Sequence, residues 1–304
     1  MKHLLGLQGV PAEEIYAILD TAKSFRELLD RPNKKVPSLR GTTIVNLFFE
    51  NSTRTRISFE LAEKRLSADI INFTSSGSSI SKGETLLDTV HNIESMKIDL
   101  VVVRHSGAGV PAFLAKNTHA IVLNAGDGAH EHPTQALLDM FTMRRRFGEI
   151  KGLRVAIVGD IRFSRVARSD AWGLKTLGAD VVFCGPPTLM PRDLSDLDVE
   201  IAPNLEQAVR GADVVMALRV QRERQSAGYL ASEREYRACY GVTRERLDAW
   251  NPSAMVMHPG PVNRNIELDS EVADSEQSVI LNQVTNGVAV RMAALYLLAG
   301  GSKE

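Results

Sequence analysis

The sequence lacks the features that would place it in several common protein classes. It has two cysteines, Cys184 and Cys239, which form neither a disulfide framework nor a zinc-binding spacing. We therefore expect reduced thiols in a cytoplasmic protein. The longest apolar runs, such as Thr43–Phe49 and Leu100–Val103, fall far short of the roughly 20 residues that a membrane helix needs. The N-terminus shows no secretory signal, and we find no short repeat or low-complexity tract.

Charge of either sign is not in excess. The 304 residues include 36 basic and 37 acidic side chains, for a net charge of -1. This balance argues against a general nucleic-acid or membrane-surface binder, because such proteins carry a basic surplus. The basic set is nonetheless uneven, with 25 arginines and 11 lysines. Arginine suits planar, bidentate contacts to carboxylate and phosphate groups.

Apolar strand-like runs alternate with helical patterns along the whole chain. Such alternation is typical of βαβ units and parallel sheets, and the length suggests about two domains. We expect a first helix that begins at Pro11. Further helices are expected over Ser52–Leu66, Glu84–Met96, Pro133–Phe147, Val166–Leu177, Leu205–Arg210 and Gly287–Ala299. We expect strands over Thr42–Phe49, Asp69–Phe73, Asp99–Arg104, Ala120–Asn124, Leu153–Gly159, Ala179–Cys184, Asp213–Leu218 and Ala254–Met257. The sequence therefore predicts an α/β protein of two doubly wound domains, each a parallel sheet flanked by helices.

Polar and small residues follow most of the expected strands. Ligands of open α/β sheets bind beyond the carboxyl ends of the strands, so these segments are the candidate site. They are Glu50–Thr55, Arg104–His105, Asn124–His132, Gly159–Arg165, Arg219–Gln221 and His258–Pro261.

The strongest single motif is Ser52-Thr53-Arg54-Thr55-Arg56, between an expected strand and an expected helix. A helix N-terminus presents free backbone N–H groups and a partial positive charge, so it can bind phosphate. A simple N-cap with surface arginines is the alternative explanation. Three hydroxyl residues and two arginines at one such corner favour the phosphate site.

A second motif is His132-Pro133-Thr134-Gln135. Pro133 fixes the start of the helix, so His132 and Gln135 are expected on its same side at the strand ends. An imidazole or an amide there can donate to a carbonyl oxygen that gains charge. His130 and His132 lack the i, i+4 spacing of a helical metal pair, and we expect neither a metal nor a cofactor.

Together the motifs resemble the catalytic chain of the aspartate carbamoyltransferase family, within the aspartate/ornithine carbamoyltransferase superfamily, over nearly the whole sequence. The similar segments are Phe48–Arg56, Lys82-Gly83-Glu84-Thr85, Val103-Arg104-His105, Asn124–Gly128, His132–Gln135, Val158-Gly159-Asp160 with Arg165, Arg219-Val220-Gln221 and His258–Pro261. The resemblance implies transfer of a carbamoyl group from carbamoyl phosphate to L-aspartate, an early step of pyrimidine synthesis. It also implies a carbamoyl-phosphate domain (1–132, completed by a C-terminal helix at 287–304 that packs back on it) and an aspartate domain (133–286).

The resemblance assigns roles to individual residues. Ser52, Thr53, Arg54 and Thr55 would hold the phosphate, while Thr55, Arg104 and His132 would polarise the carbonyl oxygen. Gln135 and the backbone around Gly260 and Pro261 would accept the carbamoyl amide hydrogens. Arg165 would take the α-carboxylate of aspartate, and Arg219 with Gln221 the β-carboxylate.

The serine-rich stretch that ends at Lys82 carries a further implication. In the family this loop reaches into a neighbouring subunit's site, so a homotrimer is implied, with Ser78 and Lys82 acting on the neighbour. Ser79 is an alternative to Ser78. Regulatory chains or a pathway-enzyme partner are possible additions.

Two residues fit the resemblance less directly. Glu50, next to the phosphate motif, could form an ion pair with Arg165 or Arg224 between the two halves; a solvated charge is the simpler interpretation. Gly260 stands where other family members can carry a bulkier apolar residue, and glycine eases the backbone turn.

Three other functions remain open at this point. Ornithine carbamoyltransferases share the Ser-Thr-Arg-Thr-Arg motif, but typically carry His-Pro-Cys-Gln and His-Cys-Leu-Pro; Arg219 also suits an anionic side chain. A nicotinamide-dependent dehydrogenase is more distant, because Gly159–Ser164 lacks the glycines that approach a pyrophosphate. A non-catalytic interaction protein is the third.

Overall fold

The computed structural model describes residues 1–74, 85–221 and 228–300. The chain divides into two compact units. Unit 1 comprises Met1–Leu138 and the chain from Thr285 onward, and unit 2 comprises Asp139–Val284. Both boundaries fall inside helices, so helices α5 (Pro133–Phe147) and α11 (Ile280–Leu298) each contribute residues to both units.

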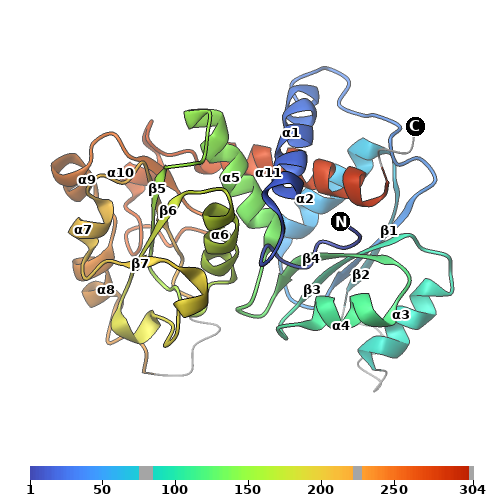
Figure 1. Cartoon of the computed structure of the whole chain (residues 1–304), viewed down its shortest axis with the longest axis horizontal. Coiled ribbons are helices and arrows are strands. Elements are labelled where there is room, and N and C mark those ends of the chain that lie inside the picture. The colour runs from blue at the N-terminus through green and yellow to red at the C-terminus, as the bar shows by residue number, and fades with distance from the viewer. Residues whose placement is uncertain (75–84, 222–227, 301–304) are drawn as a thin grey trace. The chain divides into compact units, whose positions relative to one another are not determined.

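Unit 1 contains a four-stranded parallel sheet in the order β2-β1-β3-β4 (Figure 1). Its elements, besides the parts of α5 and α11, are α1 (Ala12–Leu28), β1 (Thr43–Phe48), α2 (Thr53–Leu66), β2 (Asp69–Thr74), α3 (Leu86–Glu94), β3 (Leu100–His105), α4 (Val110–Asn117) and β4 (Ile121–Asp127).

Helices cover both faces of this sheet, which explains the nearly continuous apolar runs of its strands. Val90 of α3 and Leu114 of α4 pack with β-branched residues of three strands, including Val101 and Val122. In Figure 1, α3 and α4 lie on one face, and α2 and α11 lie on the other. The N-terminal helix α1 buries Ile15 and Leu19, on the apolar face that the sequence predicts.

The end of the chain packs against the beginning of α2. Arg291 of α11 donates from Nη1 to the hydroxyl of Ser58 at 2.9 Å, and its guanidinium lies 5.1 Å from the centre of the Phe59 ring. Tyr296 meets Phe25 of α1 edge to face. The expected return of the C-terminal helix to the first domain is therefore confirmed, although α11 begins seven residues before the expected Gly287.

Unit 2 contains a five-stranded parallel sheet in the order β7-β6-β5-β8-β9. Its elements are β5 (Arg154–Val158), α6 (Arg165–Thr176), β6 (Asp180–Cys184), η2 (Pro187–Leu189), η3 (Ser195–Leu197), β7 (Glu200–Ile201), α7 (Leu205–Val209), β8 (Val214–Ala217), α8 (Glu233–Tyr240), α9 (Arg244–Trp250), β9 (Met255–Met257) and α10 (Ser270–Ala273).

The core of unit 2 also has two sides. Leu205 of α7 and Leu247 of α9 pack with Val182, Val215 and Val256 of three strands. Helix α6 lies on the opposite face (Figure 1). The α/β class with two helix-flanked parallel sheets is as the alternation of strands and helices predicts.

No helix within the described parts of the chain is long and apolar enough to cross a membrane.

Candidate active site

In unit 1, the phosphate motif lies where the winding of the sheet reverses. From β1 the chain continues to β2 on one side, while β3 lies on the other side of β1. Phe48 pairs with Arg104 across β1 and β3, and the Phe49 amide donates to the Arg104 carbonyl at 2.9 Å. Such a switch point is where open α/β sheets bind ligands, and it brings Ser52–Thr55 beside Arg104.

Helix α2 begins directly at this point, with Ser52 as its N-cap. Among the described residues, no backbone amide donates to the Ser52 side chain as a cap. The first-turn amides of an α-helix have no intrahelical acceptor, and Thr53 and Thr55 of this turn each carry a hydroxyl that can also donate. Arg54 and Thr53 are exposed. Arg56 is instead directed to Glu60 of the next turn, 3.6 Å away.

Arg104 is buried to 9% exposure, and its guanidinium is held from two sides. Nη1 donates to the Ala125 carbonyl of β4 at 3.1 Å, and Nη2 donates to Glu50 Oε1 at 3.3 Å. Glu50, which the sequence leaves either as a solvated charge or as a partner of Arg165 or Arg224, contacts Arg104 of its own unit. This contact orients the guanidinium at the switch point.

His132 and Gln135 lie at the start of α5, 5% and 8% exposed respectively. The Gln135 amide donates to the His132 carbonyl at 2.9 Å, which closes the first turn. His132 lies on the loop that follows β4, the strand next to β3. Arg104, near the end of β3, and the loop of His132 therefore lie at the ends of adjacent strands of one sheet.

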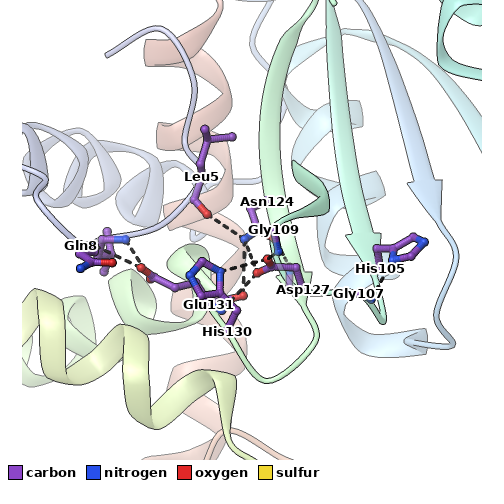
Figure 2. Close-up of polar contacts among 11 residues, drawn as sticks. Leu5, Gln8, His105, Gly107, Gly109, Asn124, Asp127, His130 and Glu131 are labelled. Carbon is purple, nitrogen blue, oxygen red and sulfur yellow. Dashed lines mark hydrogen bonds and ion pairs between the residues drawn. The ribbon is translucent and has the colours of Figure 1, made fainter. Parts of the chain in front are cut away.

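The loop between β4 and His132 is organised by a buried carboxylate, Asp127 (Figure 2). Burial would raise the pKa of Asp127, but hydrogen bonds outweigh it and hold the pKa below the usual value. The carboxylate therefore stays ionised around neutral pH. The donors are His130 Nδ1 at 3.0 Å, Asn124 Nδ2 at 2.8 Å, and the amides of Gly109 at 2.7 Å and Glu131 at 3.1 Å.

Unit 2 repeats the switch-point arrangement. From β5 the chain continues to β6 on one side, while β8 lies on the other. Arg165 follows β5 and begins α6, where Ser164 accepts the Ala167 amide as the N-cap. Arg219 follows β8, and its Nη2 donates to Gln221 Oε1 at 3.0 Å. Two arginines and an amide are thus placed at neighbouring strand ends.

Asp160 links these two strand ends. Its Oδ2 accepts the Gln221 amide at 3.0 Å, and its Oδ1 accepts the Phe163 amide at 3.1 Å. Asp160 is fully buried. The carboxylate therefore fixes the segment of Arg219 and Gln221 against the loop that leads to Arg165.

The third strand-end segment of unit 2 follows β9. The buried imidazole of His258 lies 3.3 Å from Glu267 Oε1 and accepts the Gly260 amide on Nδ1 at 2.8 Å. Gly260 has a φ of +71° and precedes a cis peptide to Pro261. Positive φ strongly favours glycine, which explains why a bulkier residue is absent here.

The structure gives the positions of most predicted site residues, and the roles of all of them in substrate binding remain predictions. Ser78, Ser79, Lys82 and Arg224 lie outside the described residues. The remaining candidates fall into two groups, one at the strand ends of each unit.

Two family models match almost the entire chain. Residues 2–145 match the "Aspartate/ornithine carbamoyltransferase, carbamoyl-P binding domain", and residues 151–298 match the "Asp/Orn binding domain". The chain belongs to the aspartate/ornithine carbamoyltransferase family. The resemblance drawn from the sequence motifs is thereby confirmed.

Individual members of the family are similar over full length. The aspartate carbamoyltransferase catalytic subunit of Gemmatimonas aurantiaca is 58% identical over 303 residues, which covers 100% of this chain and 95% of that protein. Aspartate transcarbamoylase of Trypanosoma cruzi, solved with carbamoyl phosphate and aspartate, is 30% identical with a TM-score of 0.89, covering 97% of this chain and 96% of that one. Ornithine carbamoyltransferase of Pyrococcus furiosus is 32% identical with a TM-score of 0.88, covering 99% and 98%. The fold is therefore common to both branches of the family.

Sequence reasoning gave no role to three carboxylates near the strand ends. Asp127 and Asp160 stand inside the quoted motifs, and Glu131 immediately precedes the His132 motif. Their position at the end of a strand or shortly after it was the available signal. Their contacts are mostly to backbone amides, whose place in space the sequence does not reveal.

Proposed function

We propose that this chain is an aspartate carbamoyltransferase. It transfers the carbamoyl group of carbamoyl phosphate to the amine of L-aspartate, giving N-carbamoyl-L-aspartate and phosphate in pyrimidine biosynthesis. The observation that carries the aspartate branch is the pair Arg165 and Arg219 at the switch point of unit 2, with Gln221 fixed beside Arg219. A dicarboxylate needs such cations, whereas the ammonium of ornithine would be repelled by them.

Unit 1 supplies the groups for carbamoyl phosphate in this proposal. The amides at the start of α2, the hydroxyls of Ser52, Thr53 and Thr55, and the Arg54 guanidinium bind the phosphate. A helix N-terminus favours an anion through both its free amides and its dipole. When the bond between the carbamoyl carbon and the phosphate oxygen breaks, the phosphate remains bound to these donors. They therefore stabilise the leaving group as well as the substrate.

The carbonyl of the substrate is polarised by Thr55, Arg104 and His132. As the amine attacks, negative charge develops on the carbonyl oxygen, and each preorganised donor is worth about 3–4 kcal/mol. Gln135 and the backbone at Gly260 and Pro261 orient the carbamoyl amide. Attack is direct and needs no covalent enzyme intermediate, because the carbamoyl group already carries a good leaving group.

Unit 2 and the neighbouring subunit supply the groups for aspartate. Arg165 binds the α-carboxylate, and Arg219 with Gln221 binds the β-carboxylate; Lys82 of an adjacent protomer adds a cation. Fixing both carboxylates orients the amine, and such orientation can supply about 7–11 kcal/mol of the barrier reduction.

Two assays test the activity. Purified protein is incubated with carbamoyl phosphate and either L-aspartate or L-ornithine, and release of phosphate and the carbamoylated product are measured. Turnover with aspartate alone is expected. Turnover with ornithine alone would assign the other branch of the family, and inactivity with both would favour a non-catalytic protein.

The proposed assembly is a cytoplasmic homotrimer with shared sites. Cys184 and Cys239 are both free thiols, in keeping with a reducing compartment. Inactive Lys82→Ala and Arg54→Ala protomers are mixed, dissociated and reassembled. Recovered activity is expected, because a hybrid trimer contains some sites with both residues intact. No recovery would mean that each site is built within one chain.

Light scattering with nucleotide titration would detect a regulatory chain or pathway-enzyme partner.

A further inference from the structure

A carboxylate with no proposed substrate contact connects the loop that follows Arg104 and β3 with the loop that carries His132. Asp127 is the last residue of β4 and is 1% exposed. Its two oxygens serve different segments. Oδ2 accepts the Gly109 amide, in the loop that follows Arg104 and β3, whereas Oδ1 accepts the Glu131 amide, immediately before His132. One side chain therefore spans both loops, as Figure 2 shows.

We propose that Asp127 is a positioning residue for carbamoyl transfer: it holds the loop that follows Arg104 and β3 against the loop of His132, in the register that places both donors on the same carbonyl oxygen. This inference rests on the proposed function. It goes beyond the substrate-binding groups, because Asp127 acts only through the two loops.

The backbone around Asp127 reinforces the same connection. The Asp127 amide donates to the Glu131 carbonyl at 3.1 Å, and the Gly128 amide donates to the His105 carbonyl at 3.0 Å. The second contact runs from the loop after β4 to the last residue of β3. Backbone hydrogen bonds therefore already connect the two loops, and the Asp127 carboxylate adds its own hydrogen bonds to the same connection.

The far side of the loop is also anchored. The Glu131 carboxylate accepts the amides of Leu7 at 2.9 Å and Gln8 at 3.2 Å. Asn124 Nδ2 bridges from Asp127 to the Leu5 carbonyl at 2.8 Å. Since the N-terminal segment holds Glu131 from one direction and Asp127 holds it from the other, His132 starts from a fixed backbone.

The ionised form of Asp127 is essential to this arrangement. All four of its neighbours are donors, so a carboxylate satisfies them and an amide cannot satisfy all of them. In Asp127→Asn an NH2 group replaces one of the two carboxylate oxygens. This group is itself a donor, and it faces other donors. Asp127→Ala removes both oxygens at once.

The decisive experiment compares turnover with phosphate binding. Wild type, Asp127→Asn and Asp127→Ala are assayed for kcat and for KM of carbamoyl phosphate and aspartate. Binding of inorganic phosphate is measured by calorimetry, because it reports on the α2 donors that Asp127 does not contact. A displacement of about 1 Å can cost about 100-fold in rate, so we expect a loss of this order in kcat for Asp127→Ala. A smaller loss is expected for Asp127→Asn, with phosphate affinity unchanged in both.

Glu94 offers a matched control in the same unit. Its carboxylate accepts three donors, from Thr118 Oγ1, the His119 amide and the Ala120 amide. These lie before β4 and not after it, so Glu94 braces the opposite end of the strand. Glu94→Ala is expected to lower the thermal midpoint while leaving kcat unchanged.

The outcomes separate the two claims. An inactive wild type overturns the proposed function and this inference with it. An active wild type whose kcat survives in both Asp127 variants overturns only the inference. Phosphate affinity that falls in parallel with kcat would mean general loss of structure, and would also overturn it. If Asp127→Ala does not fold, Asp127→Asn decides by the same criteria.

Discussion

Glu63 is expected to make unit 1 less stable as the pH rises towards neutrality. It lies fully buried on α2, and burial is the largest effect that raises its pKa, to about 7 from 4.5. Its Oε2 accepts from Asn46 Nδ2 at 2.8 Å, and the same nitrogen donates to Asn72 at 3.0 Å. Within the described residues, Glu63 Oε1 and Asn46 Oδ1 are buried without a hydrogen-bond partner. Protonation turns one oxygen of the Glu63 carboxyl group into a donor.

The sign and size of this change in stability with pH follow from proton linkage. Because the folded state binds this proton more tightly than the unfolded chain, the resulting stabilisation is complete below pH 4.5 and is lost between pH 4.5 and about 7. A shift of this size corresponds to about 3 kcal/mol at 1.36 kcal/mol per pH unit. Glu63→Gln cannot ionise and lacks this loss. The free energy of unfolding of the variant, minus that of wild type, should therefore rise by about 3 kcal/mol across the same window.

The assay must report on unit 1. Both tryptophans, Trp172 and Trp250, belong to unit 2, so tryptophan fluorescence would follow the other unit. Hydrogen exchange of the β1 amides, measured by mass spectrometry from pH 4.5 to 8, reports locally once intrinsic exchange rates are corrected for pH. Glu60→Gln is the control, since Glu60 lies on the same helix but is only partly buried. A difference between Glu63→Gln and wild type that does not change with pH would refute the reasoning.

Three further predictions concern other parts of the molecule. Arg219→Ala should raise the KM for aspartate about 10–100-fold, as loss of a charge-assisted hydrogen bond does, and calorimetry should show unchanged phosphate binding; an unchanged KM would contradict its role. Burial and then the charge of Asp139 raise the pKa of Asp170, so Asp170→Asn should stabilise unit 2 increasingly above pH 4, by about 1–3 kcal/mol at neutrality. Urea unfolding followed by tryptophan fluorescence checks this, and equal stability at neutral pH would refute it. A methyl group at Gly6 would lie 2.4 Å from Glu131 Oε1, so Gly6→Ala should cost about 1–3 kcal/mol; an unchanged thermal midpoint would show that the carboxylate can move away.

All described strands except β7 could be predicted, because each is a short apolar run followed by polar residues. Strand β7 was missed because it comprises only Glu200 and Ile201, both exposed. The short helices α8, α9 and α10 were missed as well. Helix α4, Val110–Asn117, was missed because glycines at 107 and 109 precede it and it is only eight residues long. The predicted start of α11 was also wrong. Its first turns expose Leu281 and Val284, so the buried apolar pattern becomes evident only later in the helix.

The residues of the candidate site also divide into those that the sequence could predict and those that it could not. Arg54, Arg104, Arg165 and Arg219 could be named in advance, because each lies at or near the end of a strand, carries a charge that suits an anion, and stands in a motif that resembles the family. Asp127 could not be given a role, since its partner Gly109 comes from another loop and contributes only a backbone amide. A sequence records which groups are charged, but backbone contacts depend on how the strands are ordered in the sheet.

The packing of α11 on α2 has a consequence for synthesis on the ribosome. Ser58 and Phe59 emerge early in synthesis, whereas Arg291 lies 233 residues beyond Ser58 in the chain. At about 5–20 residues per second, the interval is on the order of 10–50 s. During that time the nascent N-terminal sheet lacks one of its covering helices. Helix α2 therefore reaches its final surroundings only after α11 has been translated, and chaperones have most opportunity to bind this face before then.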